Sequence, residues 1–210
     1  RVARDATGNG HDGTLWNMGE SPWIAGPDDA APIRGNKGAL RFDGVNDVVT
    51  VSEHPAFRLN GDFTLSVWIR RDASAVRNGE RILDHDHRTN WALILSASDD
   101  DAGHAAFQWP DSSGAAWSSA NHAPLNDGRW HHLAVVATDD EASIYVDGQR
   151  RFGRAGITRV VHPGGAKVGI GNNISNKPER EGFTGAIDDL RVYDRALSES
   201  EVAALAAGRP

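Results

Sequence analysis

The chain has 210 residues, of which 39% are hydrophobic and 24% are charged, and its formal net charge is −7. A chain of this length can bury one sizeable core, so we predict a single domain over residues 1–210. The acidic balance argues against a nucleic-acid partner, because phosphate binding needs a concentrated basic face. No apolar run approaches the length of a membrane-spanning helix, so we expect no membrane insertion.

Strand-length segments follow one another between glycine, proline and Asx turns along most of the chain. In chain order, the predicted strands are Ala39–Phe42, Val48–Val51, Phe63–Arg70, Arg81–His85, Trp91–Ser96, Ala105–Trp109, Ala116–Ala120, His131–Ala137, Ala142–Val146, Lys167–Ile170 and Phe183–Tyr193. The stretch Gly19–Gly38 is typical of a long surface loop. Near the C-terminus, Ser198 and Glu201 form a capping box before an Ala/Leu-rich run, which indicates a helix. The pattern predicts an all-β fold, a two-sheet antiparallel jelly-roll sandwich with one short C-terminal helix.

Four ordered stretches carry a family resemblance. They read DATGNGHDGTL, ALRFDGVNDVVTV, FTLSVWIR with the later DGRWHHLAVVATDDEASIYVDGQ, and GAIDDLRVYDRALSESEV. Together they resemble the laminin-G-like, concanavalin A-like lectin/glucanase jelly roll, in particular the bacterial modules of secreted carbohydrate-active proteins. The resemblance implies a secreted or cell-surface location. It does not fix an activity, because this fold hosts lectins, glycosidases, lyases and adhesion modules.

Two adjacent acids, Asp188 and Asp189, lie within the last predicted strand. Successive side chains of a strand face opposite sides, so Asp188 is expected on the apolar face of Leu190 and Val192. A carboxylate in such a place needs a compensating charge.

The family resemblance implies that this charge is a structural Ca²⁺ ion, shared between an Asp of the last strand and a loop near the N-terminus. The loop DATGNGHDG offers the oxygen ligands that calcium prefers. The predicted metal ligands are Asp5, Asn9, Asp12, Asp43 and Asp188. The alternative for Asp43 and Asp47 is that they cap a turn by accepting hydrogen bonds from backbone N–H groups.

Signatures of catalysis are missing from the sequence. Retaining glycosidases of this fold carry an E-x-D-x-x-E strand, which no glutamate here matches. Glu179 and Glu181 alternate within a proline-containing segment, which we interpret as a solvated charged turn. His85 and His87 could share a zinc ion if their strand continues, and the alternative is a polar strand end. We therefore expect no catalytic residues.

Tryptophan points toward binding, since the chain has 7 Trp but 2 Tyr. Trp68 and Trp130 match family positions that pack in the core, whereas Trp109 and Trp117 are expected to face each other across a hairpin. Rings beside polar side chains suit sugars, and burial in the core is the alternative for each ring. Sugar-binding relatives use rim loops or the concave sheet, which implies these carbohydrate-binding residues: Asp84, His87, Asn90, Trp91, Trp109, Trp117, Asn172 and Asn173.

These features favour a non-catalytic carbohydrate-binding module with a structural calcium ion. Its partners would be a polysaccharide or oligosaccharide and a neighbouring catalytic domain of a longer chain. It would raise the effective concentration of that catalytic domain at the polymer. A protein-binding adhesion module and a glycosidase or lyase with an atypical site around Asp84–His87 stay open as alternatives.

Overall fold

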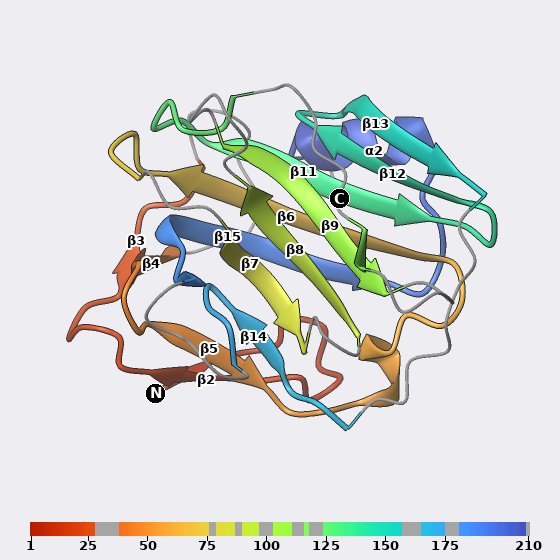
Figure 1. The fold of residues 1–210 in the computed structure, drawn as a ribbon. Coiled ribbons are helices and arrows are strands. Elements are labelled where there is room, and N and C mark those ends of the chain that lie inside the picture. The colour runs from red at the N-terminus through yellow and green to blue at the C-terminus, as the bar shows by residue number, and fades with distance from the viewer. Residues whose placement is uncertain are drawn as a thin grey trace.

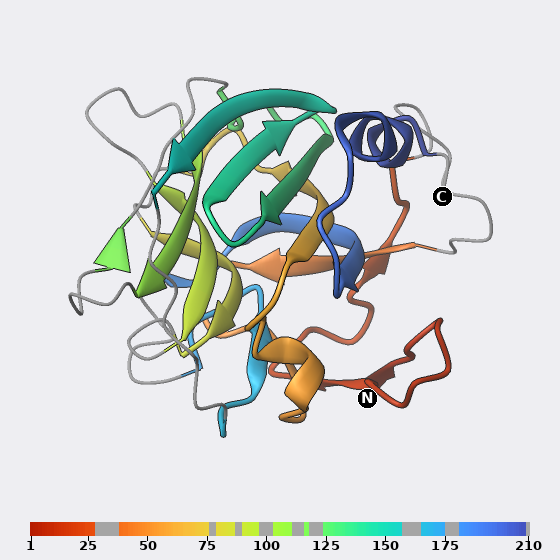
Figure 2. The same cartoon turned by 90° about the vertical axis from the view of Figure 1, so that its right-hand side faces the viewer.

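The computed structural model of the chain describes residues 1–27, 38–75, 79–86, 90–96, 103–110, 116–117, 124–156, 165–174 and 181–208. Within these ranges the strands form an eight-stranded and a seven-stranded sheet, which pack against each other as a sandwich (Figures 1 and 2). The predicted fold class is confirmed. No helix among the described residues has the length and apolar composition needed to cross a membrane.

The neighbouring strands of each sheet run antiparallel. In spatial order, the described strands of the eight-stranded sheet are β1 (Val2–Ala3), β2 (Gly13–Trp16), β5 (Val48–Val51), β14 (Val168–Ile170), β7 (Glu80–His85), β8 (Trp91–Ser96), β9 (His104–Pro110) and β10 (Ala116–Trp117). Those of the seven-stranded sheet are β13 (Gln149–Ala155), β12 (Glu141–Val146), β11 (His131–Ala137), β6 (Phe63–Arg71), β15 (Thr184–Tyr193), β4 (Ala39–Asp43) and β3 (Trp23–Ile24). A 3₁₀ turn, η1 (Pro55–Phe57), follows β5.

The predicted strands recur close to their expected bounds, apart from Ala116–Ala120, of which only the first two residues are described. The long loop predicted over Gly19–Gly38 needs a correction. It contains β3, in which Trp23 pairs with Leu40 of β4. Residues 28–37 of that stretch lie outside the described part of the chain.

The core lies between the sheets and is built from alternate side chains of their strands. Leu65, Val67 and Ile69 of β6 meet Leu93 and Leu95 of β8 in one buried cluster. Burying each such side chain contributes about 1.5–3 kcal/mol before the cost of ordering the chain. This inward alternation leaves the next residue of each strand on an outer face.

The C-terminal helix α2 (Glu199–Ala206) packs against the outer face of the seven-stranded sheet (Figure 2). Its side chains Val202 and Leu205 meet Ala134 of β11 and Tyr145 of β12. The Ser198 side chain accepts a hydrogen bond from the Glu201 backbone N–H, and the Glu201 side chain accepts one from the Ser198 N–H. The predicted capping box is therefore confirmed.

Strand β15 runs through the middle of the seven-stranded sheet, between β6 and β4 (Figure 1). Ile187 pairs with Ile69 of β6, and both side chains belong to the core. The next pair, Asp188 with Trp68, must then face the opposite side of the sheet. Asp188 is consequently an outer-face residue, although it is only 8% exposed.

A β-bulge follows Asp188 and changes the alternation of β15. The register shifts between Asp188 and Arg191, and Asp189 adopts a positive φ of 43°. Because the bulge adds a residue, Leu190 and Val192 return to the core side. The expectation that Asp188 shares their face is wrong for this reason.

Two neighbouring histidines at the start of β11 have opposite electrostatic environments. His131 places Nδ1 2.9 Å from Asp147 Oδ2 and Nε2 3.1 Å from Asp127 Oδ1, and these hydrogen-bonded carboxylates, Asp147 foremost, raise its pKa. His132 is fully buried, with Nε2 2.9 Å from Ser66 Oγ, and burial lowers its pKa from 6.5 to about 4. Both side chains are thus part of the structural frame.

The two histidines predict a pH optimum of stability. Folded His131 holds its proton more tightly than the unfolded chain does. Its contribution is complete below the unfolded pKa of 6.5 and is lost as pH rises through the raised folded value. His132 contributes above pH 6.5 and loses this as pH falls toward 4. The joint contribution should peak near pH 6.5, as measured by urea denaturation across the pH range.

The variant His131→Asn should remove the contribution that is lost above pH 6.5, while the loss of the His132 contribution as pH falls from 6.5 toward 4 remains. If the free energy of unfolding of this variant falls above pH 6.5 as steeply as that of the wild type, the two carboxylates do not act through His131.

Candidate functional site

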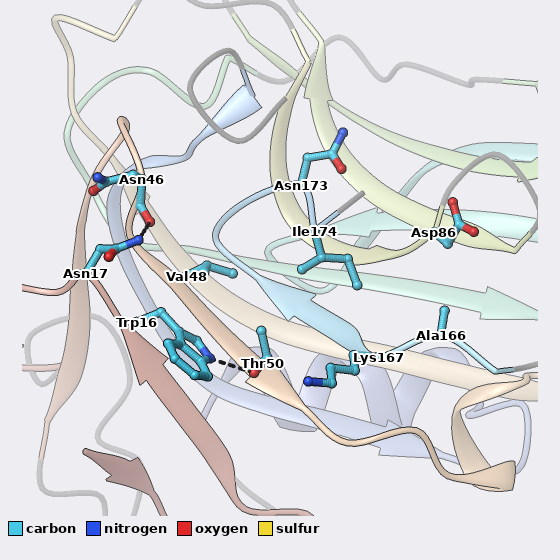
Figure 3. A pocket seen from close by; sticks show the side chains of 10 residues that line it. All are labelled: Trp16, Asn17, Asn46, Val48, Thr50, Asp86, Ala166, Lys167, Asn173 and Ile174. Atoms are coloured by element: carbon cyan, nitrogen blue, oxygen red, sulfur yellow. Dashed lines mark hydrogen bonds between the residues drawn. The ribbon is translucent and has the colours of Figure 1, made fainter. Parts of the chain in front are cut away.

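A groove with a volume of about 590 Å³ lies on the outer face of the eight-stranded sheet (Figure 3). Leu15 and Val49 belong to the core, so Trp16 and Thr50, the next residues of β2 and β5, face away from it. The lining residues are Trp16, Asn17, Asn46, Val48, Thr50, Asp86, Ala166, Lys167, Asn173 and Ile174. The groove therefore brings together segments that lie far apart in sequence.

Trp16 supplies an aromatic surface at the edge of this groove. The residue is 50% exposed, and its indole Nε1 donates a hydrogen bond to Thr50 Oγ1 at 2.9 Å (Figure 3). The hydrogen bond satisfies the polar end of the ring and holds it beside β5. What the ring still offers to a ligand is apolar surface.

Polar side chains line other parts of the groove. Asn17 has a positive φ of 59°, and its Nδ2 donates to the Asn46 carbonyl at 3.0 Å. Lys167 is exposed and extends across the groove toward Thr50 (Figure 3). Asp86 follows β7 on the other side. Amides, an ammonium group and a carboxylate beside a ring can bind the hydroxyls of a ligand whose C–H face packs on the indole.

The two tryptophans that were expected to bind sugar and have described side chains are buried. Trp91 is 1% exposed and donates through Nε1 to the Phe57 carbonyl at 2.8 Å, and Trp109 is 2% exposed within the core. Neither ring is open to a ligand in this structure. Trp109 pairs with Trp117 between β9 and β10, which confirms the hairpin. The side chain of Trp117 and the whole of His87 lie outside the described residues.

The described polar residues expected at the site are also buried, and one of them lines the groove. Asn173 lines it directly. Asp84 Oδ2 accepts a hydrogen bond from the Ile174 N–H at 3.3 Å, and Asn172 Nδ2 donates to the Asp47 carbonyl at 3.4 Å. Asn90 is fully buried.

Trp16 was missing from the expected set, although the sequence carried a signal for it. In the stretch GTLW, Leu15 alternates with Thr14 and Trp16, which is the pattern of a half-buried strand. With Leu15 facing the core, Trp16 had to face outward.

The predicted calcium loop is closed by hydrogen bonds of its own. Asp5 Oδ1 accepts from the Thr7 N–H and hydroxyl at 2.9 and 2.6 Å, and Oδ2 accepts from the His11 N–H at 3.1 Å. The Thr7 hydrogen bonds lower the Asp5 pKa to about 2. Asp12 accepts from the Asp5 N–H and from Arg4, both at 2.8 Å.

The remaining predicted ligands lie in other settings. Asp43 Oδ1 accepts from the Val45 N–H at 2.8 Å, so the turn-capping alternative holds for Asp43. Asp188 Oδ1 accepts from the Asp189 N–H at 2.8 Å, in a middle strand of the seven-stranded sheet. The loop that contains Asp5, Asn9 and Asp12 follows β1, the edge strand of the other sheet.

The five predicted ligands thus do not form one oxygen cluster. Among the residues that the structure describes, no group of three or more His, Asp or Glu side chains could hold a metal ion. Calcium binding stays a prediction. For zinc, His85 is buried with Nε2 3.2 Å from the Ala166 carbonyl, and its expected partner His87 is not described.

The hydrogen bonds of Asp5 predict a metal-independent role. Asp5→Ala should lower the free energy of unfolding by about 1 kcal/mol in the presence of EDTA, because three backbone and hydroxyl donors lose their acceptor. Urea denaturation with EDTA and with added CaCl₂ measures this, and exposed Asp194→Ala is the control. A loss that appears only with CaCl₂ would instead identify Asp5 as a metal ligand.

Comparison with known proteins identifies the family of this chain. Residues 43–203 match the family model Laminin_G_3, described as the concanavalin A-like lectin/glucanases superfamily. The chain belongs to this superfamily. The resemblance inferred from the sequence motifs is thereby confirmed.

One curated relative is the mouse (Mus musculus) "Sushi, von Willebrand factor type A, EGF and pentraxin domain-containing protein 1". The alignment is 33% identical over 97 residues and covers 43% of this chain. The match spans 3% of the length of that relative. The similarity is thus confined to one small part of a much longer protein.

Two solved structures share the fold of this superfamily member. Domain 4 of AbnA, a GH43 extracellular arabinanase from Geobacillus stearothermophilus, in complex with arabinotriose, is 21% identical with a TM-score of 0.72. The match covers 96% of this chain and 91% of that domain. The Ruminococcus gnavus IT-sialidase CBM40 bound to α2,3-sialyllactose is 11% identical with a TM-score of 0.61. That match covers 81% of this chain and 97% of the CBM40 chain. At identities this low, the structural similarity shows a common fold alone.

Proposed function

We propose that this chain is a carbohydrate-binding module and that its sugar lies in the groove beside Trp16. The observation that carries the proposal is the half-exposed indole, whose N–H is already bonded to Thr50 while its apolar surface borders a groove that also contains amide groups. Sugars present C–H faces that pack on such rings and hydroxyls that bond to neighbouring amides. Two proteins of the same fold were solved with an oligosaccharide bound, which supports this ligand class.

The groove favours binding over hydrolysis. Among its described lining residues, Asp86 alone carries a carboxylate. Glycoside hydrolysis commonly uses two carboxyl groups, one on each side of the bond. The side-chain amides of the lining asparagines can bind hydroxyls, and none of these asparagines supplies the second carboxyl group.

A binding module contributes to catalysis by another chain segment through proximity. Held on a polysaccharide by the groove, it would keep an attached catalytic domain near its substrate and raise the effective concentration there. The corresponding location is outside the cell, where polysaccharides are met, and the arabinanase domain of similar fold comes from an extracellular enzyme.

The proposal predicts that Trp16→Ala weakens glycan binding at least about tenfold, because the stacking surface is removed. Isothermal titration calorimetry would use arabinotriose, α2,3-sialyllactose and soluble arabinan, xylan and laminarin. Trp23→Ala is the matched control, since Trp23 is also 50% exposed but lies on β3 at the edge of the other sheet.

Equal losses in the two variants would remove Trp16 from the binding site. A wild-type chain that binds none of these glycans would contradict the proposed function with this panel and favour a protein-binding role.

A further inference from the structure

The turn after β14 forms one wall of the groove. Gly171 adopts a positive φ of 80°, and a Cβ atom there would lie 2.2 Å from the Phe42 ring. Glycine therefore allows the chain to turn closely over the core edge. The turn leads into Asn173 and Ile174, which both line the groove.

Several hydrogen bonds hold this turn, among them one from the Gly171 N–H to the Ile82 carbonyl at 3.0 Å. Asn172 Nδ2 reaches the Asp47 carbonyl at 3.4 Å, and the Ile174 N–H donates to Asp84 Oδ2 at 3.3 Å. The side chain of Asn173 donates through Nδ2 to Glu181 Oε2. The last contact decides the direction of the one amide of this turn that faces the groove.

Glu181 is itself held by a buried arginine. Its Oε2 atom accepts from Arg81 Nε at 3.1 Å, while Arg81 Nη1 donates to Gln108 Oε1 of β9 at 2.7 Å. The Arg81 side chain is 5% exposed and that of Glu181 is 28% exposed. The interpretation of Glu181 as a solvated charged residue is thus wrong, because it neutralises a cation that the sheet buries.

We propose that Arg81 and Glu181 are positioning residues of the groove. Neither is among the residues that line it, yet together they connect Asn173 to β7 and β9 of the sheet that forms its floor. The pair fixes the wall opposite the indole before a ligand arrives. A ligand then avoids the entropy cost of ordering that wall. The inference rests on the proposed function in so far as it concerns affinity.

The test removes both charges at once, so that no buried cation is left alone. In Arg81→Gln/Glu181→Gln, amide exchange at Asn172–Ile174, measured by hydrogen exchange and NMR, should become about tenfold faster. The matched control is Arg71→Gln/Glu80→Gln. Glu80 neighbours Arg81 on β7 and forms a fully buried ion pair of 2.7 Å with Arg71, the last residue of β6. Exchange at the turn should be unchanged in the control.

The second measurement is affinity for arabinotriose by calorimetry, at a temperature where both double variants are folded by near-UV circular dichroism. The Arg81/Glu181 variant should bind about three- to tenfold more weakly, and the Arg71/Glu80 control should bind like the wild type. Unchanged exchange at the turn, or faster exchange with unchanged affinity, would overturn the inference.

The two proposals fail in different ways. If the wild type does not bind arabinotriose, the carbohydrate proposal loses support for this sugar, and exchange at the turn alone decides whether the pair holds the wall. If binding depends on Trp16 but the Arg81/Glu181 double substitution changes neither amide exchange at the turn nor affinity, the proposed function stands and the positioning role is wrong.

Discussion

The burial of two sheet faces against each other is the constraint on which the rest of this structure depends. Each strand gives one set of alternate side chains to the core, and the other set is left on an outer face. The two outer faces differ in what covers them. Helix α2 covers part of the face of the seven-stranded sheet, and the face of the eight-stranded sheet carries the groove.

The same constraint explains the two adjacent acids of β15. A strand between two neighbours cannot turn both side chains of a consecutive pair to one side. The bulge places Asp188 on the outer face and gives Asp189 a positive φ, after which Leu190 again reaches the core. Asp189 then pairs with Arg191, with Oδ1 2.9 Å from Nε. The acids therefore find partners within their own strand segment.

Local signals in the sequence were sufficient for most of the fold. Strand positions, the Ser198 capping box and the family membership all follow from short stretches, because alternation, turn residues and helix caps act over a few residues. The bulge in β15 could not be predicted from the sequence, since Asp and Arg residues do not indicate that a strand contains an extra residue. The assignment of faces after Asp188 failed at that point.

The site was harder to predict because it depends on which face of a strand is buried. Trp91 and Trp16 both lie in strands of the same sheet, yet Trp91 is in the core and Trp16 is half exposed. In WALILS every residue is compatible with burial, so alternation alone could not place Trp91. The Arg81–Glu181 pair spans 100 residues of sequence, and no local pattern connects its members.

Strand β7 shows how one short segment can support both the core and the groove. Glu80 and Arg81 are consecutive, so their side chains leave the strand on opposite sides. Glu80 pairs with Arg71 on the core side, and Arg81 pairs with Glu181 on the groove side. Each ion pair is costly to bury, and removing one partner strongly destabilises the folded protein because the other charge is left buried without compensation. The inner pair joins the ends of β6 and β7, whereas the outer pair joins β7 to the segment that precedes β15. Because the groove wall is attached to the same strand that helps to close the core, its position is set by the packing of the sandwich.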